Sequence, residues 1–339
     1  MSSNDPRGGA TPPSPETPQA ADAVPHRSPT RGRPEMDTLQ ALPAGAVGLR
    51  AFAKINLHLE VLRLRPDGWH SIETVFQSVG LFDTLHLVPR PAGISMLCDS
   101  KHLTVDEDNL CLRAARALLK EAGREKPPVG VRIDLYKRIP VAAGFAGGSA
   151  DAAATLMGLN RLWKLRFDAE RLASVGAQLG SDVVFCLRGG TAFGTGRGDH
   201  LETLPNLPET VFLLVFPKIS ISAEWAYLQL NMGLTRRPRT LSMNRLKTIL
   251  ARYQSAARVF YNRLEDAVVP THPRVGEVID QLIECGATFA MMSGSGSGVF
   301  GAFPDLATAE TARDEIGRPD WPRRVVTSKS KGVEFFGPV

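Results

Sequence analysis

The stretch Ile139–Thr155 constrains the fold of this chain more than any other, because a glycine-rich loop separates a strand pattern from a helix pattern there. Before it, residues 131–135 alternate between apolar and polar side chains, as the residues of a half-buried strand do. After it, Leu156, Leu159 and Trp163 recur at helical spacing in a segment rich in alanine. The sequence therefore predicts a strand, a loop and a helix in that order.

This loop has the composition of a phosphate-binding loop. Glycines let the backbone turn tightly and approach a ligand, and the first amides of the following helix point outward, where the helix dipole favours negative charge. The alternative is an ordinary glycine-rich turn with Ser149 as the N-cap of the helix. Neither a Walker A motif nor the G-x-G-x-x-G fingerprint of dinucleotide-binding folds is present.

Composition limits the class of protein. The chain has 339 residues, enough for two domains, and its 43% hydrophobic and 22% charged residues are ordinary for a globular protein. A net charge of +5 suits a small anionic substrate, and the absence of a Lys/Arg block with interleaved aromatics argues against nucleic-acid binding. Four widely spaced cysteines form no C-x-x-C motif, which favours reduced thiols in a cytoplasmic protein. No apolar run approaches the length of a membrane span.

Residues 1–47 are rich in Pro, Ser, Thr, Gly and Ala, so we expect a disordered tail. The tail lacks the apolar core of a secretory signal, and its acidic residues argue against the alternative of a plastid-type transit peptide. The linker Pro205–Pro208 then divides the rest into an N-terminal domain at 48–207 and a C-terminal domain at 208–339.

Hydrophobic periodicity predicts the remaining elements. We expect strands at 49–64, 84–88, 131–135, 211–216, 287–292, 299–303 and, as the last strand, 324–328, with a further apolar segment at 75–81 and a turn at 65–68. We expect helices at 108–123, 222–230, 241–253, 274–285 and 307–316, and one that begins at Asp168 and gives way to an apolar segment near 179–185. A second glycine-rich stretch at 189–198 is strand-like, and 236–239 is a basic loop. Strands and helices mix without strict βαβ alternation, which predicts an α+β fold.

Five segments in the same order resemble motifs of one enzyme superfamily. Ala51–Leu57, Pro140–Ala154 and Met292–Gly296 resemble the three motifs of the GHMP kinases. Arg65–His70 and Leu179–Val183 resemble one branch, the kinases of 4-diphosphocytidyl-2-C-methyl-D-erythritol in the non-mevalonate isoprenoid pathway. The resemblance extends from about residue 49 to the end of the chain.

The resemblance implies both a fold and a reaction. The N-terminal domain would be like the second domain of a small-ribosomal-subunit protein and would carry the phosphate loop, and the C-terminal domain would be ferredoxin-like. The activity would be ATP-dependent phosphorylation of the 2-hydroxyl of the cytidyl-diphosphate substrate, with Mg²⁺ accompanying ATP. The chain would act as a monomer or homodimer, without nucleic acid or membrane partners.

The resemblance also assigns the ATP site to the glycine-rich loop. Its backbone amides would wrap the ATP phosphates, and the hydroxyl of Ser149 would meet a phosphate or Mg²⁺. The residues assigned to ATP are Pro140, Val141, Ala142, Ala143, Gly144, Phe145, Ala146, Gly147, Gly148, Ser149 and Ala150.

Asp182 matches the catalytic base of the family, and Lys54 matches the lysine that is paired with it. A carboxylate near the acceptor hydroxyl could take its proton, and an ammonium beside it would favour the carboxylate and the developing alkoxide. The structural alternatives are a helix-capping Asp182 and a solvated Lys54. Asp151 is the rival base, but we interpret it as structural or metal-adjacent, because a carboxylate is favoured in the first turn of a helix by the dipole alone.

Four residues match the substrate site of the branch. Asn56 shares a strand face with Lys54 and would bind a hydroxyl or phosphate of the substrate. His70 would read the cytosine edge, since an imidazole supplies both a donor and an acceptor. Trp69 and Tyr227 would stack on opposite sides of the base, although packing within a helix would also explain Tyr227.

The third motif would support the phosphate loop, and the segment Asn262–Glu265 would be structural. Three departures from the family pattern concern the loop and Asp182. Ala146 stands where the family has glycine, which is costly if the position needs positive φ. Ala150 lacks a hydroxyl, and Val184 replaces a proline. Two alternatives therefore stay open: another GHMP kinase, for homoserine, mevalonate or a sugar, and a nucleotide sensor without catalysis.

Overall fold

The computed structural model of the chain describes residues 42–230, 240–253, 259–318 and 320–337. The expected tail lies outside these residues except for 42–47, of which Val47 already belongs to the first strand. The expected basic loop at 236–239 also lies outside them.

Strands and helices alternate irregularly along the described chain. The strands are β1 (Val47–Leu64), β2 (His70–Arg90), β3 (Ile94–Cys98), β4 (Gly130–Tyr136), β5 (Thr191–Thr195), β6 (His200–Thr203), β7 (Val211–Val215), β8 (Phe289–Met292), β9 (Val299–Phe303), β10 (Arg323–Lys329) and β11 (Val333–Phe336). The helices are α1 (Leu110–Glu121), α2 (Gly147–Leu162), α3 (Ala169–Leu179), α4 (Ser181–Arg188), α5 (Ala223–Leu228), α6 (Met243–Ala251), α8 (Glu265–Thr271), α9 (Pro273–Glu284) and α10 (Leu306–Glu315).

One mixed sheet connects the strands, in the order β11-β1-β2-β10-β7-β9-β8, with β4 and β5 also paired to β2. Strands β1 and β2 form a long antiparallel hairpin that closes at the predicted turn, where the amide of Gly68 donates to Arg65 O at 3.0 Å. The pairing register of this hairpin shifts between Phe52 and Lys54 and again between Asn56 and His58. Such bulges re-aim side chains, and these two flank the residues expected in the site.

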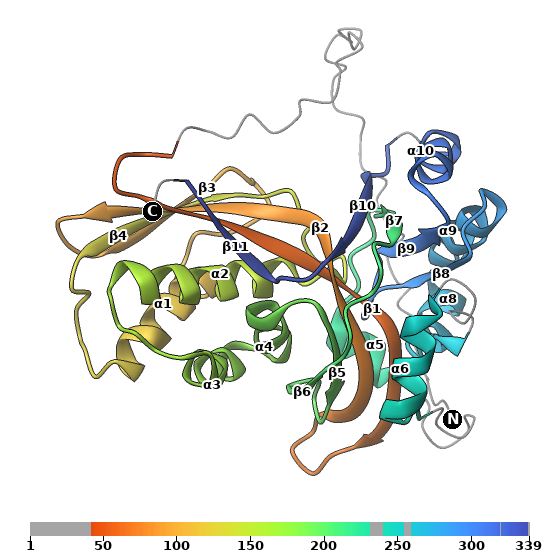
Figure 1. The fold of residues 1–339 in the computed structure, drawn as a ribbon, viewed down its shortest axis with the longest axis horizontal. Helices are drawn as coiled ribbons and strands as arrows, with labels where there is room; N and C mark the ends of the chain where they lie inside the picture. Colours follow the sequence, from red (N-terminus) through yellow and green to blue (C-terminus); the bar gives the residue numbers. More distant parts are fainter. Residues whose placement is uncertain (1–41, 231–239, 254–258, 319, 338–339) are drawn as a thin grey trace, which may run out of the picture. The chain divides into compact units, whose positions relative to one another are not determined.

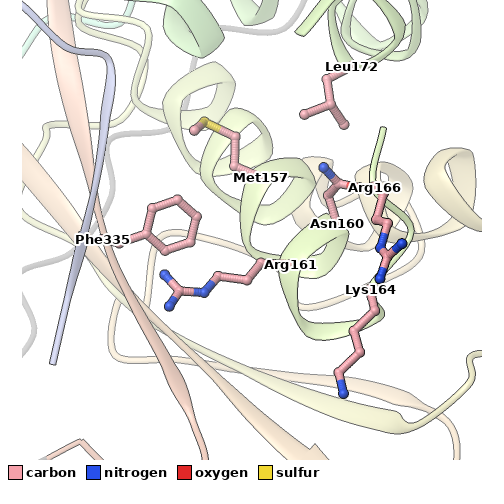
Figure 2. Close-up of a pocket in the computed structure, with 7 residues that line it drawn as sticks. All are labelled: Met157, Asn160, Arg161, Lys164, Arg166, Leu172 and Phe335. Carbon is pink, nitrogen blue, oxygen red and sulfur yellow. The ribbon is translucent and has the colours of Figure 1, made fainter. Parts of the chain in front are cut away.

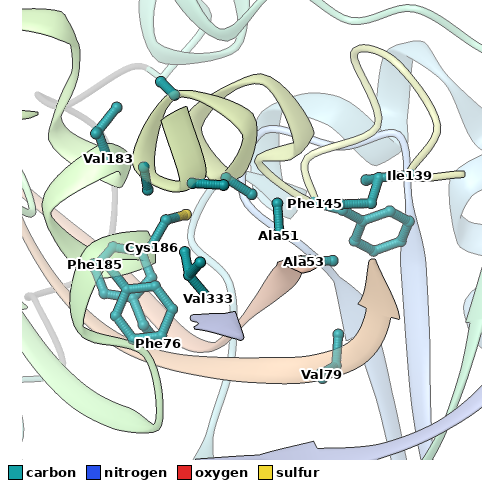
Figure 3. Close-up of a cluster of buried hydrophobic side chains, with 14 of the residues drawn as sticks. Ala51, Ala53, Phe76, Val79, Ile139, Phe145, Val183, Phe185, Cys186 and Val333 are labelled. Atoms are coloured by element: carbon teal, nitrogen blue, oxygen red, sulfur yellow. The ribbon is translucent and has the colours of Figure 1, made fainter. Parts of the chain in front are cut away.

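The first half of the chain packs helices onto one face of this sheet. In Figure 1, α1, α2, α3 and α4 lie together on one side of the sheet formed by β1, β2 and β4, and α2 contacts both β1 and β2. Figure 3 shows how the buried faces meet: Ala51 and Ala53 of β1 lie in one cluster with Phe145, Val183 and Cys186. Lys54 follows directly after this buried segment, at the first of the two register shifts.

A second apolar cluster lies around β7, β8 and β9 and includes Leu59 and Val61 of β1. Leu213 and Val215 of β7 are buried together with Val278 and Leu282 of α9 and with Val299 of β9. Strand β10 pairs with β7 and, at two residues, with β2, while β11 pairs with β1. The C-terminal strands thus return to the first half of the chain. The domain boundary near residue 207 stays a prediction.

Side-chain caps explain where several helices begin. The side chains of Asn109, Asp168, Ser222 and Asp305 each accept a hydrogen bond from a backbone amide in the first turn of α1, α3, α5 and α10, respectively. Each satisfies an amide that has no acceptor within the helix. The predicted N-cap at Asp168 is confirmed.

Three local predictions need correction. The segments at 75–81 and 84–88 are parts of one strand, β2, whose apolar pattern is broken by the buried carboxylate of Asp83. The apolar segment near 179–185 is largely helix α4, since a short apolar run is compatible with either a strand or a helix. The strand at 324–328 is not the last, because β11 follows it after a turn. The prediction also missed β3, β6 and α8.

Candidate active site

The glycine-rich loop connects β4 to α2 and ends at a residue in a left-handed conformation. Ala146 occupies the N-cap position of α2 with φ 57° and makes no side-chain cap. Ser149 lies inside the first turn, so the alternative with Ser149 as N-cap is wrong. The condition set for position 146 is met, because Ala146 has positive φ, a region in which a non-glycine residue loses about 1–2 kcal/mol. Ala142 and Gly144 also have positive φ, 54° and 76°.

A buried ion triad anchors the loop from behind. The ammonium of Lys137, next to the loop, lies 2.5 Å from Asp83 Oδ2 and 2.7 Å from Asp151 Oδ2. The other oxygen of Asp83 accepts hydrogen bonds from the amides of Arg138 and Ile139, at 2.5 and 2.9 Å. The triad therefore joins β2, the start of the loop and the first turn of α2.

Asp151 is committed to this triad. Its side chain is 3% exposed, and burial, with the charge of Asp83, raises its pKa well above the usual range, although Lys137 opposes the shift. The pKa of Lys137 is raised against the effect of its burial, because two carboxyl groups face it. This burial and pairing agree with the structural role expected for Asp151.

The opposite side of the loop rests on Lys54 of β1. Its ammonium donates to Asn56 Oδ1 at 2.8 Å and to Gly144 O at 3.0 Å, and it lies 3.4 Å from Asp182 Oδ2. Its backbone amide donates to Phe145 O at 3.1 Å. Lys54 is thus held in one place by the strand, the loop and the facing carboxylate, and is not solvated.

Asp182 lies in the first turn of α4, after Gly180 as the N-cap residue. Its side chain is 35% exposed, whereas that of Lys54 is 5% exposed. The carboxylate therefore faces solvent, where a substrate could enter, and its buried partner keeps it oriented. This is the arrangement that a general base needs before substrate binds.

The third motif packs directly against the loop, as expected. The hydroxyl of Ser293 donates to Gly144 O at 3.0 Å and accepts from the amide of Asn56 at 3.3 Å. The amide of Gly298 donates to Ala143 O at 3.0 Å. A Cβ at Gly144 would lie 2.0 Å from Ser293 O, so only glycine allows this approach.

The segment Asn262–Glu265 holds the third motif in turn. The Nδ2 of Asn262 donates to Met292 O at 2.8 Å and to Gly294 O at 2.7 Å. The amide of Met292 donates to Glu265 Oε1 at 2.7 Å. Burial raises the pKa of Glu265 to about 7, although this hydrogen bond opposes the shift. The contacts agree with the structural role expected for the segment.

Of the three ring residues expected at the cytosine site, two stack on each other and the third contacts a cation. His70 and Tyr227 stack on each other, with ring centroids 5.3 Å apart and planes at 21°. Burial raises the pKa of Tyr227, and the charge of Asp182 raises it further, so Tyr227 lies close enough to Asp182 to be affected by its charge. Trp69 is 61% exposed, and the guanidinium of Arg197 lies 5.6 Å from its ring centroid.

Sequence reasoning missed several of these contacts. Asn56 also donates through Nδ2 to Thr74 Oγ1 at 2.8 Å, a partner on the neighbouring strand. Lys137 could have been noticed as a cation directly before a phosphate loop, and Arg197 as a cation inside the second glycine-rich stretch. Asp83 gave no local signal, because its partners are more than 50 residues away in sequence.

The part of the chain that the structure describes contains no group of three His, Cys, Asp or Glu side chains that could hold a metal ion. Near the loop, the carboxyl of Asp151 is occupied by Lys137.

None of the described helices is long and apolar enough to cross a bilayer.

Two protein-family models match the chain. The GHMP kinases N terminal domain matches residues 109–190, which include the loop and Asp182, and the GHMP kinases C terminal domain matches residues 242–319, which include the third motif.

Curated relatives match across most of their length. A 4-diphosphocytidyl-2-C-methyl-D-erythritol kinase of Synechococcus sp. (strain JA-3-3Ab) is 42% identical over 279 residues, covering 80% of this chain and 89% of the relative. The enzyme of the same name from Gloeobacter violaceus (strain ATCC 29082 / PCC 7421) is 44% identical over 273 residues, covering 78% and 88%.

Solved structures agree with this similarity. A crystal structure of 4-(cytidine 5'-diphospho)-2C-methyl-D-erythritol kinase matches with a TM-score of 0.71 and 32% identity, over 83% of this chain and 98% of that one. Homoserine kinase from Cytophaga hutchinsonii matches with a TM-score of 0.64 at 18% identity, over 86% of this chain and 97% of that one, which supports the fold alone.

Proposed function

The chain belongs to the 4-diphosphocytidyl-2-C-methyl-D-erythritol kinases of the GHMP superfamily. On this basis we propose the role that each site residue has in the reaction. The activity is ATP-dependent phosphorylation of 4-diphosphocytidyl-2-C-methyl-D-erythritol in the non-mevalonate isoprenoid pathway, EC 2.7.1.148. The acceptor group in our proposal is the 2-hydroxyl. The observation that carries the proposal is the contact of Lys54 with both Gly144 of the loop and Asp182.

The loop from Pro140 to Ala150 binds the phosphates of ATP. The first-turn amides of α2 have no acceptor within the helix and lie at the positive end of its dipole. Mg²⁺ would be carried by the nucleotide, with the Ser149 hydroxyl as a candidate ligand, and would neutralise charge on the phosphates when bound.

Asp182 accepts the proton of the 2-hydroxyl as that oxygen attacks the γ-phosphorus. The bond from the γ-phosphorus to the bridging β–γ oxygen breaks, and ADP leaves. The ammonium of Lys54 stabilises the negative charge that develops on the attacking oxygen, and its three contacts hold it there without reorganisation. Asn56, in contact with Lys54, orients the acceptor end of the substrate.

The cytosine lies at the aromatic residues beside Asp182. A base does not fit between His70 and Tyr227, whose ring centroids are 5.3 Å apart, because a base between two rings needs about 7 Å between them. In our proposal the base lies on a different face of Tyr227, with exposed Trp69 covering it and His70 reading its polar edge.

The test compares ADP release by the wild type and by Asp182→Asn, with Mg-ATP and the cytidyl substrate. Loss of a general base lowers kcat by about 10²- to 10⁴-fold, and we expect ATP affinity to change little. Asp151→Asn is the matched control, because it removes the same charge from the rival carboxyl, and it should stay within about tenfold of the wild type. If kcat fell by two or more orders of magnitude in Asp151→Asn but not in Asp182→Asn, the general base would be Asp151.

We further propose a cytoplasmic location, as a monomer or homodimer. All four cysteines, Cys98, Cys111, Cys186 and Cys285, are free thiols, which supports a reducing compartment. The boundary between the proposed domains lies near residue 207.

A further inference from the structure

A pocket lies at the far end of α2 from the phosphate loop. Its volume is about 460 Å³, and Figure 2 shows three cationic side chains around it, Arg161, Lys164 and Arg166. We call it the α2-end pocket. Along the axis of α2, Gly147 and Arg161 are separated by about 21 Å, at 1.5 Å per residue. The pocket is therefore distinct from the proposed ATP site.

The three cations are available for an anion. Among the described residues none of them forms an ion pair, and all three are exposed. The guanidinium of Arg161 lies 5.0 Å from the ring centroid of Phe335, within the range of a cation–π contact. Three unpaired cations around one hollow repel one another, and an anion would relieve this repulsion.

Apart from Asn160, whose side-chain amide is paired with the backbone of Phe167, the rest of the wall is apolar. Met157 of α2, Leu172 of α3 and Phe335 of β11 line the same pocket. A bare inorganic anion would gain nothing from contact with this apolar surface, whereas an organic group attached to an anion would bury it. The lining thus matches a ligand with one charged end and one apolar or planar end.

Stabilisation of the helix end is the simpler explanation for cations in this place, because cations interact favourably with a helix C-terminus. Only Arg161 lies in the last turn of α2, however. Lys164 has φ 54° at the position after the C-cap, where its amide donates to Arg161 O at 3.1 Å. Glycine is the preferred residue there, so a lysine at this position costs backbone energy.

The segment after α2 is also held in a definite shape. Arg166 is a second cation with positive φ, 59°. The side chain of Asn160 donates to Phe167 O at 2.9 Å and accepts from the amide of Phe167 at 3.0 Å. The backbone that carries Lys164 and Arg166 is therefore fixed by hydrogen bonds, and both side chains are presented at one pocket.

We propose that the α2-end pocket binds a small phosphorylated compound that carries an apolar or planar organic group. The phosphate lies among Arg161, Lys164 and Arg166, and the organic part covers Phe335, Leu172 and Met157. The site is separate from the active site and needs no residue of it.

Phenyl phosphate is the probe, titrated calorimetrically into the full chain after saturation with Mg-ADP at low salt, with inorganic phosphate in a parallel titration. We expect saturable binding of phenyl phosphate, several-fold tighter than that of inorganic phosphate. Lys164→Gly should weaken it about three- to tenfold, the range for loss of one exposed charge contact. The same variant should keep or raise the thermal midpoint, because glycine suits the left-handed backbone.

The matched control is Lys120→Gln, compared with Lys164→Gln. Lys120 is an exposed lysine in the last turn of α1, outside the pocket, and its loss should leave phenyl phosphate binding unchanged. Binding that is equal in the wild type, Lys164→Gly and Lys164→Gln would overturn the site, as would the absence of saturable binding. Inorganic phosphate binding as tightly as phenyl phosphate would overturn the organic part of the ligand.

Discussion

Lys137→Met tests whether the buried triad supports the phosphate loop. The methionine fills a similar volume but removes the only cation whose contacts with Asp83 and Asp151 the structure shows, at 2.5 and 2.7 Å. Two carboxyl groups, 0% and 3% exposed, would then face each other without it. Removing one partner of a buried ion pair costs about 3–5 kcal/mol, a large share of the roughly 5–15 kcal/mol by which a folded protein is stable.

Neutralising a carboxyl should restore part of this loss. In the variant, Asp151→Asn leaves one buried charge instead of two, so the double variant should be at least about 1 kcal/mol more stable than Lys137→Met alone. Acidic pH should act in the same direction. Burial and Asp83 already raise the pKa of Asp151, and without the lysine it rises further, so the deficit shrinks as pH falls and protons bind.

Urea unfolding at pH 7.5 and pH 5.5 measures these differences, and ATP titration follows the loop. We expect weaker ATP binding in Lys137→Met, because Asp83 also holds the amides of Arg138 and Ile139 where the loop begins. An unfolding free energy within 1 kcal/mol of the wild type at pH 7.5 would refute the reasoning. A deficit that does not change with pH or with Asp151→Asn would refute its electrostatic part.

Three further variants test other parts of the site. Gly144→Ala should lower the unfolding free energy measured in urea by about 3–5 kcal/mol, because its Cβ would lie 2.0 Å from a carbonyl oxygen and its φ is positive. In Gly148→Ala, inside a helix, the atom nearest to the new Cβ would be 3.3 Å away, so the unfolding free energy should stay the same or rise by up to about 1 kcal/mol. Ala146→Gly should raise the unfolding free energy by about 0.5–1 kcal/mol, since relief of left-handed strain exceeds the entropy of glycine. As pH rises from 4.5 to about 7, the wild type should lose about 3 kcal/mol of unfolding free energy, because a carboxyl group whose pKa is raised by folding stabilises the fold only at low pH. Glu265→Gln should not show this loss.

Each variant has an outcome that contradicts its reasoning. Equal stability of Gly144→Ala and Gly148→Ala would mean that the close approach of the third motif is not needed. Ala150→Gly is the control for Ala146→Gly, since a glycine inside the helix should cost about 1 kcal/mol or more, and a loss in both variants would contradict the strain at 146. Parallel pH profiles of the wild type and Glu265→Gln would contradict the raised pKa of Glu265.

Local patterns predicted most of the elements but not how they meet. The strand at 49–64, the turn at 65–68 and the N-cap at Asp168 follow from periodicity and from turn and capping chemistry, and the structure has all three. The pattern failed where tertiary contacts decide, as in β2, which continues through Asp83 because that buried carboxyl has partners on the phosphate loop.

The site residues could be predicted from the sequence only through the resemblance to the kinase family. Lys54 and Asp182 are 128 residues apart, and no periodicity relates them, although their side chains meet at 3.4 Å. Lys137 was not recognised as a key contact, because a single lysine in a sequence looks the same whether it lies on the surface or in a buried network. For Ala146 the sequence raised only the condition that alanine would be costly at positive φ, and the structure shows that the residue does have positive φ.

The pairing of β11 with β1 has a consequence for synthesis. Gly48–Ala51, in the same strand as Lys54, pair with Val333–Phe336, nearly 290 residues later. The ribosome therefore synthesises the proposed catalytic lysine long before the strand that covers this edge of β1. The nascent chain exposes an unpaired edge of β1, next to its pairing with β2, until the end of translation. A product that stops before residue 333 would contain every proposed catalytic residue and still lack the strand that closes this edge, which makes it a candidate for aggregation and not a smaller enzyme.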